Sequence, residues 1–179
     1  PDVPCVRLRR AGVELDLGGI AKGYALDAAQ RAAQAAGATA GVFDLGGNLL
    51  IFGLAAGADS VAIAAPDDSG DIVAVLAVHE AAVATSGQYE RFVEADGEVF
   101  GHILDPRSGR PVARRGSVTV VAPTATLADA LATAAFVLGP RAGMELVARH
   151  PGTRCVIVVE DPAGGWSLLK GPAATSRSR

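Results

Sequence analysis

The sequence predicts a single α+β domain with a mixed, largely antiparallel sheet and flanking helices. Short strand-like segments recur along the chain, separated by clusters of Gly, Pro, Asp and Ser. A few proline-free stretches have the composition of helices. No internal repeat or linker divides the chain, so we expect one domain over residues 1–171 and a polar, disordered tail over residues 172–179.

Length and composition allow one buried core and exclude some partners. The chain has 179 residues, half of them hydrophobic, which suffices for one core. Its net charge of -3 lacks the basic excess of a nucleic-acid-binding protein. No stretch reaches the roughly 18 apolar residues of a membrane span. Cys5 and Cys155 fit no metal spacing, so either a disulfide in an oxidising compartment or two unpaired thiols would suit them.

The first elements follow from hydrophobic periodicity. Residues 5–9 and 13–17 alternate apolar and polar side chains, as half-buried strands do, and Ala11-Gly12 between them suits a hairpin turn. Residues 20–36 are rich in Ala, Gln, Leu and Arg, and Gly37 suits the position just after a helix. We therefore expect a hairpin followed by a helix.

The rest of the chain gives further strands and two helices. Strand-like segments lie at about 41–45, 48–53, 60–64, 72–79, 81–85 and 117–122. Hairpins are expected over residues 92–104, around Asp96-Gly97, and over residues 155–169, with another turn at 105–109. Helices are expected at 124–138 and 141–149.

The helix at 124–138 carries a polar pair on an apolar background. Leu127, Leu131 and Leu138 fall within one arc and form the expected core stripe. Asp129 and Thr133 are four residues apart, so they lie one above the other on another side. A buried carboxylate needs a partner, and Mg²⁺ would supply one, with both side chains as oxygen ligands. A small polar patch on a half-exposed helix explains the spacing equally simply.

Residues 16–27 are expected to form the end of a strand, a Gly-Gly turn and a helix start. Glycines such as Gly18 let the backbone approach a ligand closely, and free amides at a helix start suit a phosphate. Lys22 lies in the first turn, where a cation is disfavoured unless an anion is near. The glycine spacing fits neither a Walker loop nor the dinucleotide fingerprint. An ordinary tight connection is the competing interpretation.

Polar clusters follow several of the other strands. Residues 44–48 repeat the Gly-Gly theme, which suits either a close backbone approach or a simple turn. In residues 85–91, Ser86 and Tyr89 could hydrogen-bond a ligand. Residues 102–111 bring together His102, an Asp-Pro turn and two arginines, which marks either a site or a capped turn with a structural histidine.

Taken in order, five motifs resemble the ApbE family, the bacterial FAD:protein FMN transferases. They are Asp-Leu-Gly-Gly-Ile-Ala-Lys-Gly-Tyr-Ala-Leu-Asp at 16–27, Gly-Gly-Asn at 46–48, Ala-Thr-Ser-Gly-Gln-Tyr-Glu-Arg at 84–91, His-Ile-Leu-Asp-Pro-Arg-Ser-Gly-Arg-Pro at 102–111 and Ala-Asp-Ala-Leu-Ala-Thr-Ala at 128–134. The resemblance covers residues 13–139. It implies a two-lobed, T-fold-like α+β architecture with FAD between the lobes and Mg²⁺ on the FAD pyrophosphate.

The resemblance also implies roles for particular residues. The Mg²⁺ ligands would be the main-chain carbonyl of Ala21 and the side chains of Asp129 and Thr133. FAD would contact Gly18, Lys22, Tyr24 and the backbone at Ile103. FMN would pass to a Ser or Thr hydroxyl of an acceptor flavoprotein with release of AMP, and His102 is the candidate general base because histidine commonly fills that role. An FAD pyrophosphatase, a non-catalytic FAD-binding module and a fold completed by another segment or a dimer partner are the alternatives.

The chain also departs from the family pattern. Family members have a further amino-terminal segment that contributes part of the FAD pocket, whereas this chain starts at Pro1 and resembles the carboxy-terminal two thirds. Asp44 stands where the family has Asn. Family members commonly act outside the cytoplasm as lipoproteins. The sequence therefore fits an extracytoplasmic bacterial protein whose anchoring segment is absent, or a cytoplasmic one.

Overall fold

The computed structural model describes residues 5–54, 60–67, 69–87, 92–95 and 98–171. The helices are α1 (Ala21–Ala35), α2 (Ala125–Leu138) and α3 (Pro140–Ala148). The main sheet contains β1 (Gly41–Leu45), β2 (Asn48–Phe52), β5 (Ala82–Gly87), β10 (Gly116–Ala122), β11 (Arg154–Glu160) and β12 (Trp166–Lys170). Smaller antiparallel pairs are formed by β3 (Ser60–Ala64) with β4 (Ile72–Ala77), β6 (Phe92–Ala95) with β7 (Glu98–Gly101), and β8 (Leu104–Asp105) with β9 (Arg110–Pro111).

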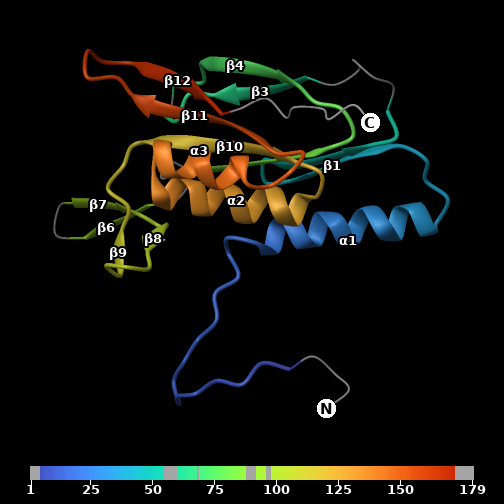
Figure 1. Cartoon of the computed structure of the whole chain (residues 1–179), viewed down its shortest axis with the longest axis horizontal. Coiled ribbons are helices and arrows are strands. Elements are labelled where there is room, and N and C mark those ends of the chain that lie inside the picture. Colours follow the sequence, from blue (N-terminus) through green and yellow to red (C-terminus); the bar gives the residue numbers. More distant parts are fainter. Residues whose placement is uncertain (1–4, 55–59, 68, 88–91, 96–97, 172–179) are drawn as a thin grey trace.

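The layers are stacked around the six-stranded sheet, whose order is β1-β2-β5-β10-β11-β12 with antiparallel neighbours throughout. The helices lie against one face, and the β3–β4 pair lies over the other (Figure 1). Trp166 Nε1 donates to Asp67 Oδ2 at 2.6 Å, which ties β12 to the β3–β4 connection. The predicted α+β class and largely antiparallel sheet are confirmed.

The central strand β10 is buried along its whole length. It pairs with β5 on one side and β11 on the other, and both of its faces are covered. A strand covered on both faces does not need the apolar and polar alternation of a half-exposed strand. Its buried Thr119 is satisfied by the hydroxyl of Thr85, with 2.9 Å between the two Oγ1 atoms.

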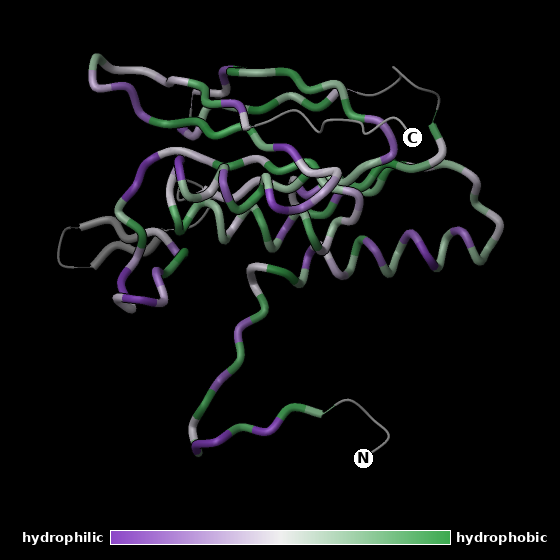
Figure 2. Tube along the Cα trace, in the orientation of Figure 1, coloured by the Kyte–Doolittle hydropathy of each residue, from purple (hydrophilic) through white to green (hydrophobic). Residues whose placement is uncertain are grey.

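Two apolar layers hold the sheet in place. The larger one joins the helices to the sheet and includes Leu26, Phe52, Val120, Phe136 and Ile157. On the other face, smaller groups centred on Val83, Val121 and Val156 pack under the β3–β4 pair. Figure 2 shows the resulting pattern, with hydrophobic strands in the middle and mixed polarity along α1.

Local signals explain where α2 begins and ends. Thr124 caps it, since the Thr124 hydroxyl accepts a hydrogen bond from the Leu127 amide at 3.3 Å. Gly139, at φ 88°, ends α2 and leads into α3, whose first residue is Pro140. The expected core stripe is partly wrong: Leu138 is exposed, while Ala132 and other small residues contact the sheet. The helix thus packs through its alanines and Phe136 as well as through Leu131.

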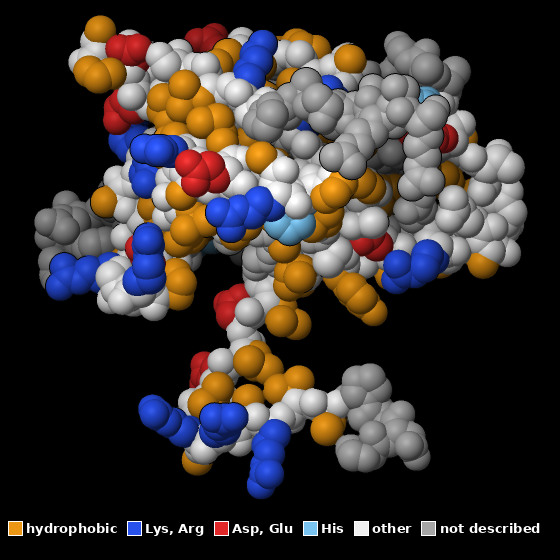
Figure 3. Space-filling view, in the orientation of Figure 1, with side chains coloured by type: hydrophobic (Ala, Val, Ile, Leu, Met, Phe, Trp, Pro, Cys, Tyr) orange, Lys and Arg blue, Asp and Glu red, His pale blue; other side chains and the backbone are white. Residues whose placement is uncertain are grey.

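The two amino-terminal strands predicted from periodicity are wrong. Residues 5–17 form no strand and run away from the body of the molecule, although Ala11-Gly12 does make a turn (Figure 1). Val6, Leu15 and Leu17 are exposed. The basic side chains of this segment stand clear of the body in Figure 3. Alternation supplies only one apolar face, and a strand also needs a partner for its amides, which the described residues do not supply.

The remaining predicted elements are confirmed to within a few residues. Three predictions fall outside the described residues: the Asp96-Gly97 turn, Tyr89 and the tail at 172–179. Cys5 is exposed and Cys155 is buried, and both are free thiols. No helix in the described part of the chain is both long enough and apolar enough to span a membrane.

Candidate active-site cavity

One cavity of roughly 630 Å³ gathers most of the candidate residues. Its walls come from the loop before α1, the start of α1, the β1–β2 turn, the end of β5, the stretch before β8, and α2. The lining residues are Asp16, Gly18, Gly19, Ala21, Lys22, Gly46, Thr85, Ser86, Gly87, His102, Ile103, Leu104, Asp129 and Thr133. All five sequence motifs therefore contribute lining residues to this cavity.

The centre of the site is the contact between α1 and α2 at Gly23. A Cβ on Gly23 would lie 2.2 Å from the Ala125 carbonyl oxygen and 2.8 Å from Asp129 Cβ, so only glycine fits there. This closeness lets the Gly23 amide donate to Asp129 Oδ2 at 2.9 Å. Asp129 is only 3% exposed, which contradicts the half-exposed polar patch that the sequence left open.

Thr133 lies one helical turn beyond Asp129 and faces the same cavity. Its Oγ1 is 3.0 Å from Ser86 Oγ on β5. The Gly18-Gly19 turn passes close by, since a Cβ on Gly19 would be 3.3 Å from Thr133 Cγ2. A side chain at Gly19 would therefore crowd Thr133 unless one of the two moved by a few tenths of an ångström.

The donor set at this wall fits a hard cation. Asp129 has one oxygen bonded to the Gly23 amide, and among the described residues nothing else donates to its carboxylate. Thr133 and Ala21 line the same cavity as Asp129. Carboxylate, hydroxyl and carbonyl oxygens are the ligands that Mg²⁺ takes. The described residues hold no cluster of three or more His, Cys, Asp or Glu, so a cation here would rely on these mixed oxygens and on ligand oxygens.

The glycine turns around the cavity are shaped by neighbouring aspartates. Asp16 Oδ1 accepts from the Gly18 amide at 2.6 Å. Asp44 Oδ1 accepts from the Gly47 amide at 2.9 Å, so this carboxylate closes its own β1–β2 turn. Lys22 Nζ donates to the Gly46 carbonyl at 3.4 Å, which places a positive charge between the two turns at the cavity.

His102 and Ile103 also line the cavity, from the stretch before β8. His102 is exposed, Ile103 is buried, and the Ile103 carbonyl accepts from the Val112 amide at 2.9 Å. The β8–β9 turn follows, where the guanidinium and main-chain amide of Arg107 bind the Asp105 carboxylate. These bonds lower the pKa of Asp105 from its usual 3.8 to about 2.

Tyr24 is the predicted contact residue that the structure leaves outside the cavity. It lies on α1 with a largely exposed ring and is not part of the lining. Sequence reasoning also gave no role to Asp27, the last residue of the first motif. Its partners lie on another helix about a hundred residues away, so no local pattern could have revealed them.

Fold and cavity together define an α+β protein with an oxygen-lined pocket at a junction of two helices. A sequence model of the ApbE family matches residues 2–157, and the chain belongs to this family. It is 40% identical over 168 residues to the FAD:protein FMN transferase of Treponema pallidum, covering 87% of this chain and 46% of that protein. It is 38% identical to the FAD:protein FMN transferase of Rhodobacter capsulatus, covering 87% of this chain and 30% of the relative.

Solved structures give the same result. The ApbE protein of Thermotoga maritima superposes with a TM-score of 0.77 at 37% identity, over 90% of this chain and 52% of that one. The flavinyl transferase ApbE of Pseudomonas stutzeri, in its apo form, gives a TM-score of 0.71 at 32% identity, over 88% and 49%. The chain thus spans about half, or less, of the length of these proteins.

Proposed function

We propose that the chain takes part in Mg²⁺-dependent transfer of FMN from FAD to a Ser or Thr hydroxyl of an acceptor protein, with release of AMP. The observation that carries the proposal is that Ala21, Asp129 and Thr133 line one cavity together with the Gly18-Gly19 turn. The transferase names of the relatives in Treponema pallidum and Rhodobacter capsulatus support the same reaction.

The site would hold the pyrophosphate of FAD through charge and close backbone approach. Ala21, Asp129 and Thr133 would hold the cation, which neutralises phosphate charge when bound. Lys22, fixed near the cavity by the Gly46 carbonyl, would add a positive charge to the same phosphates. The Gly18-Gly19 turn lets a phosphate approach the main chain without meeting a side chain. The negatively charged carboxylate of Asp44 accepts a hydrogen bond from the Gly47 amide within the β1–β2 turn.

His102 would take the proton of the incoming hydroxyl. It lines the cavity and is exposed, so an acceptor residue entering from solvent can reach it. The oxygen of the acceptor would then attack the FMN phosphorus, and the bond to the AMP oxygen would break with AMP leaving. Water in place of the acceptor hydroxyl would give FMN and AMP by hydrolysis at the same site.

One assay tests the proposal. The chain is incubated with FAD, Mg²⁺ and an acceptor protein with a Ser or Thr flavinylation motif; AMP is measured, and covalent flavin is detected by fluorescence on a denaturing gel. We expect both products, and neither after Mg²⁺ is chelated. AMP without covalent flavin would indicate the pyrophosphatase instead.

A pair of matched variants ties the assay to the site. Asp129→Asn should lower AMP release by about 10²-fold or more, because a cation ligand that acts on transferring phosphates is lost. Asp71→Asn changes an exposed aspartate outside the cavity lining and should leave the rate unchanged. Equal rates in Asp129→Asn and the unaltered chain would show that the metal assignment is wrong.

A further inference from the structure

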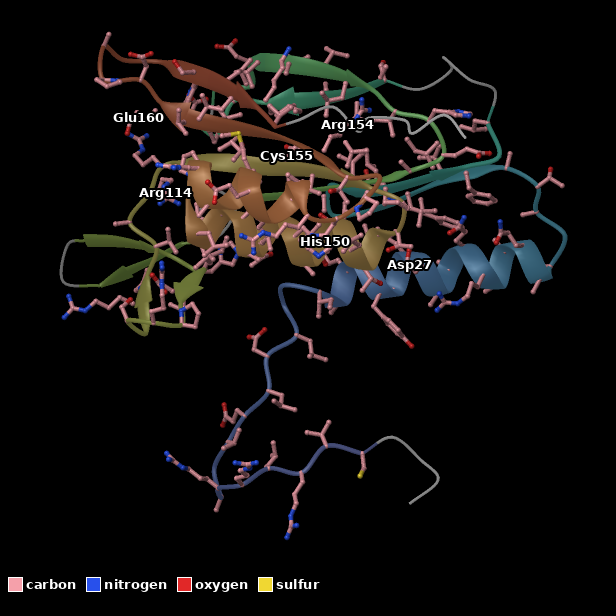
Figure 4. All side chains as sticks on the ribbon, viewed as in Figure 1. Asp27, Arg114, His150, Arg154, Cys155 and Glu160 are labelled. Atoms are coloured by element: carbon pink, nitrogen blue, oxygen red, sulfur yellow. The ribbon has the colours of Figure 1, made fainter. Side chains whose placement is uncertain are left out.

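Asp27 joins α1 to the beginning of α2. Its Oδ1 accepts from the Ala125 amide at 2.8 Å, and its Oδ2 accepts from the Thr126 amide at 2.9 Å and from the Thr126 hydroxyl. The carboxylate is nine-tenths buried. Figure 4 shows Asp27 on α1 at the point where α2 begins. It lies outside the cavity lining, so it has no direct contact with the candidate site.

These bonds complete the cap of α2. The first amides of a helix have no partner within the helix and must be satisfied from outside. Here the Thr124 hydroxyl accepts from Leu127, and Asp27 accepts from the two amides before it. A negative charge at this end also interacts favourably with the helix dipole. Asp27 therefore fixes where α2 starts relative to α1.

Asp129 makes the reciprocal contact. Its Oδ2 accepts from the amide of Gly23, the third residue of α1, whose cap position Ile20 offers no side-chain acceptor. Gly23 and Asp27 are one turn apart on α1, and Ala125 and Asp129 are one turn apart on α2. Each helix thus supplies the aspartate that caps the other, and the two contacts fix both the distance and the rotation between the helices.

We propose that Asp27 is a positioning residue for the cation site. This inference rests on the proposed function, since the site is the one formed by Ala21 on α1 with Asp129 and Thr133 on α2. Ala21 and Asp129 can share a cation only while α1 and α2 keep their present spacing, and the Asp27 bonds set that spacing one turn away. Groups that orient metal ligands from outside typically change metal affinity by about 10–100-fold when they are removed.

The Asp27→Asn variant tests whether the Asp27 bonds control the Gly23–Asp129 bond. The amide keeps the size of the side chain but removes its charge and offers one acceptor oxygen instead of two. Its NH₂ group would face the amide donors of α2, so the start of α2 should move away from α1. The Gly23–Asp129 bond should then weaken although neither residue has been changed.

The first measurement needs no cation. In the full metal-free chain, the exchange protection of the Gly23 amide is measured by NMR. We expect it to fall by about tenfold in Asp27→Asn, the size expected when a hydrogen bond worth about 1.4 kcal/mol is lost. The second measurement titrates Mn²⁺ and follows the free ion by electron paramagnetic resonance. We expect Mn²⁺ binding that depends on Asp129 to weaken by about 10-fold or more.

Thr153→Ala is the matched control. The buried Thr153 hydroxyl donates to the carbonyls of Val147 and His150, both at 2.7 Å, and so caps the end of α3 away from the cavity. This variant should lower the unfolding temperature but leave the Gly23 protection and the Mn²⁺ affinity unchanged. If Asp27→Asn does not fold, Thr126→Val, which removes only the hydroxyl donor to Asp27, should lower both quantities by a smaller factor.

Two outcomes decide the inference. If Asp27→Asn loses stability but keeps Gly23 protection and Mn²⁺ affinity within about twofold, Asp27 is only a structural cap and the proposal is overturned. If the unaltered chain shows no Asp129-dependent Mn²⁺ binding, the proposed role of a bound cation in the function is refuted. The Gly23 protection still shows in that case whether Asp27 positions the helix pair, so the two failures are distinguishable.

Discussion

The main-chain amide of Gly23 and the carboxylate of Asp129 form a buried hydrogen bond of 2.9 Å across 106 positions of sequence. A helix amide and a side chain of another helix can meet in this way only where the two backbones nearly touch. The glycine permits that approach, and the bond in turn satisfies an amide at the start of α1. The close approach of α1 and α2 at the candidate cation site therefore depends on Gly23, a residue without a side chain.

Gly23→Ala is expected to destabilise the chain. In an exposed helix the same change would stabilise by up to about 1 kcal/mol, because alanine has the higher helix propensity. At Gly23 the new Cβ would lie 2.2 Å from the Ala125 carbonyl oxygen, and such overpacking costs about 1–3 kcal/mol. Urea unfolding shows directly whether Gly23→Ala lowers or raises the free energy of unfolding. Ala32→Gly is the control, at an exposed position of α1; it should lower stability only by the difference in helix propensity and should leave FAD turnover unchanged. If Gly23→Ala were more stable than the unaltered chain, the close contact between Gly23 and α2 would be contradicted.

Ser86→Ala should weaken the site through Thr133. The two hydroxyls share a hydrogen bond of 3.0 Å, which orients the Thr133 oxygen in the cavity wall. Its loss should cost about 1 kcal/mol of stability and raise the Mg²⁺ concentration needed for half-maximal AMP release. Ser117→Ala is the control, because the buried Ser117 hydroxyl has no hydrogen-bond partner among the described residues, and its removal should be close to neutral. The same effect in both variants would refute an orienting role for Ser86.

His102→Ala should lower the rate of AMP release by about 10²–10⁴-fold if His102 is the general base. The loss should appear in kcat rather than in the affinity for FAD, since proton removal belongs to the chemical step. His79→Ala alters an exposed histidine outside the cavity and should behave as the unaltered chain does. A rate within a few-fold of the original would mean that another group, or none, takes the proton.

The two thiols should differ sharply in reactivity. Cys5 is exposed, whereas burial raises the pKa of the Cys155 thiol and hides it on β11. A thiol-specific chromophoric reagent at mildly alkaline pH should modify one cysteine of the native chain quickly and the second only after denaturant is added. Mass spectrometry of the first product should place the label on Cys5. Rapid labelling of Cys155 in the native chain would contradict its burial.

Asp105 should titrate well below an ordinary aspartate. Arg107 stabilises the charged carboxylate, so the folded-state pKa is about 2 instead of 3.8. The pair therefore contributes to folding above pH 3.8, and that contribution fades as the pH falls from 3.8 towards 2. The carboxyl carbon shift of Asp105 in an NMR titration should have its midpoint near 2, and in Arg107→Ala the midpoint should rise towards 3.8. An unchanged midpoint in the variant would exclude Arg107 as the cause.

Local sequence predicted most elements because their signals are local. The helix at 124–138 has its cap at Thr124 and its terminating glycine at Gly139, and both lie beside the helix they bound. Periodicity wrongly predicts strands at 5–9 and 13–17, because a strand depends on a partner that periodicity does not supply. The leucine spacing wrongly predicts that Leu138 is in the core, because alanines, which give a weak hydrophobic signal, make the close contact with the sheet.

By itself the sequence determined the α+β class, the positions of helices and strands, and the ordered motifs that mark the ApbE family. Only the tertiary structure decided that Asp129 is buried, that Gly23 lies against it and that Asp27 caps the opposite helix. The physical reason is the range of the forces. Helix and turn preferences act within a few residues, whereas the contacts at this cavity form between segments that packing brings together from about a hundred residues apart.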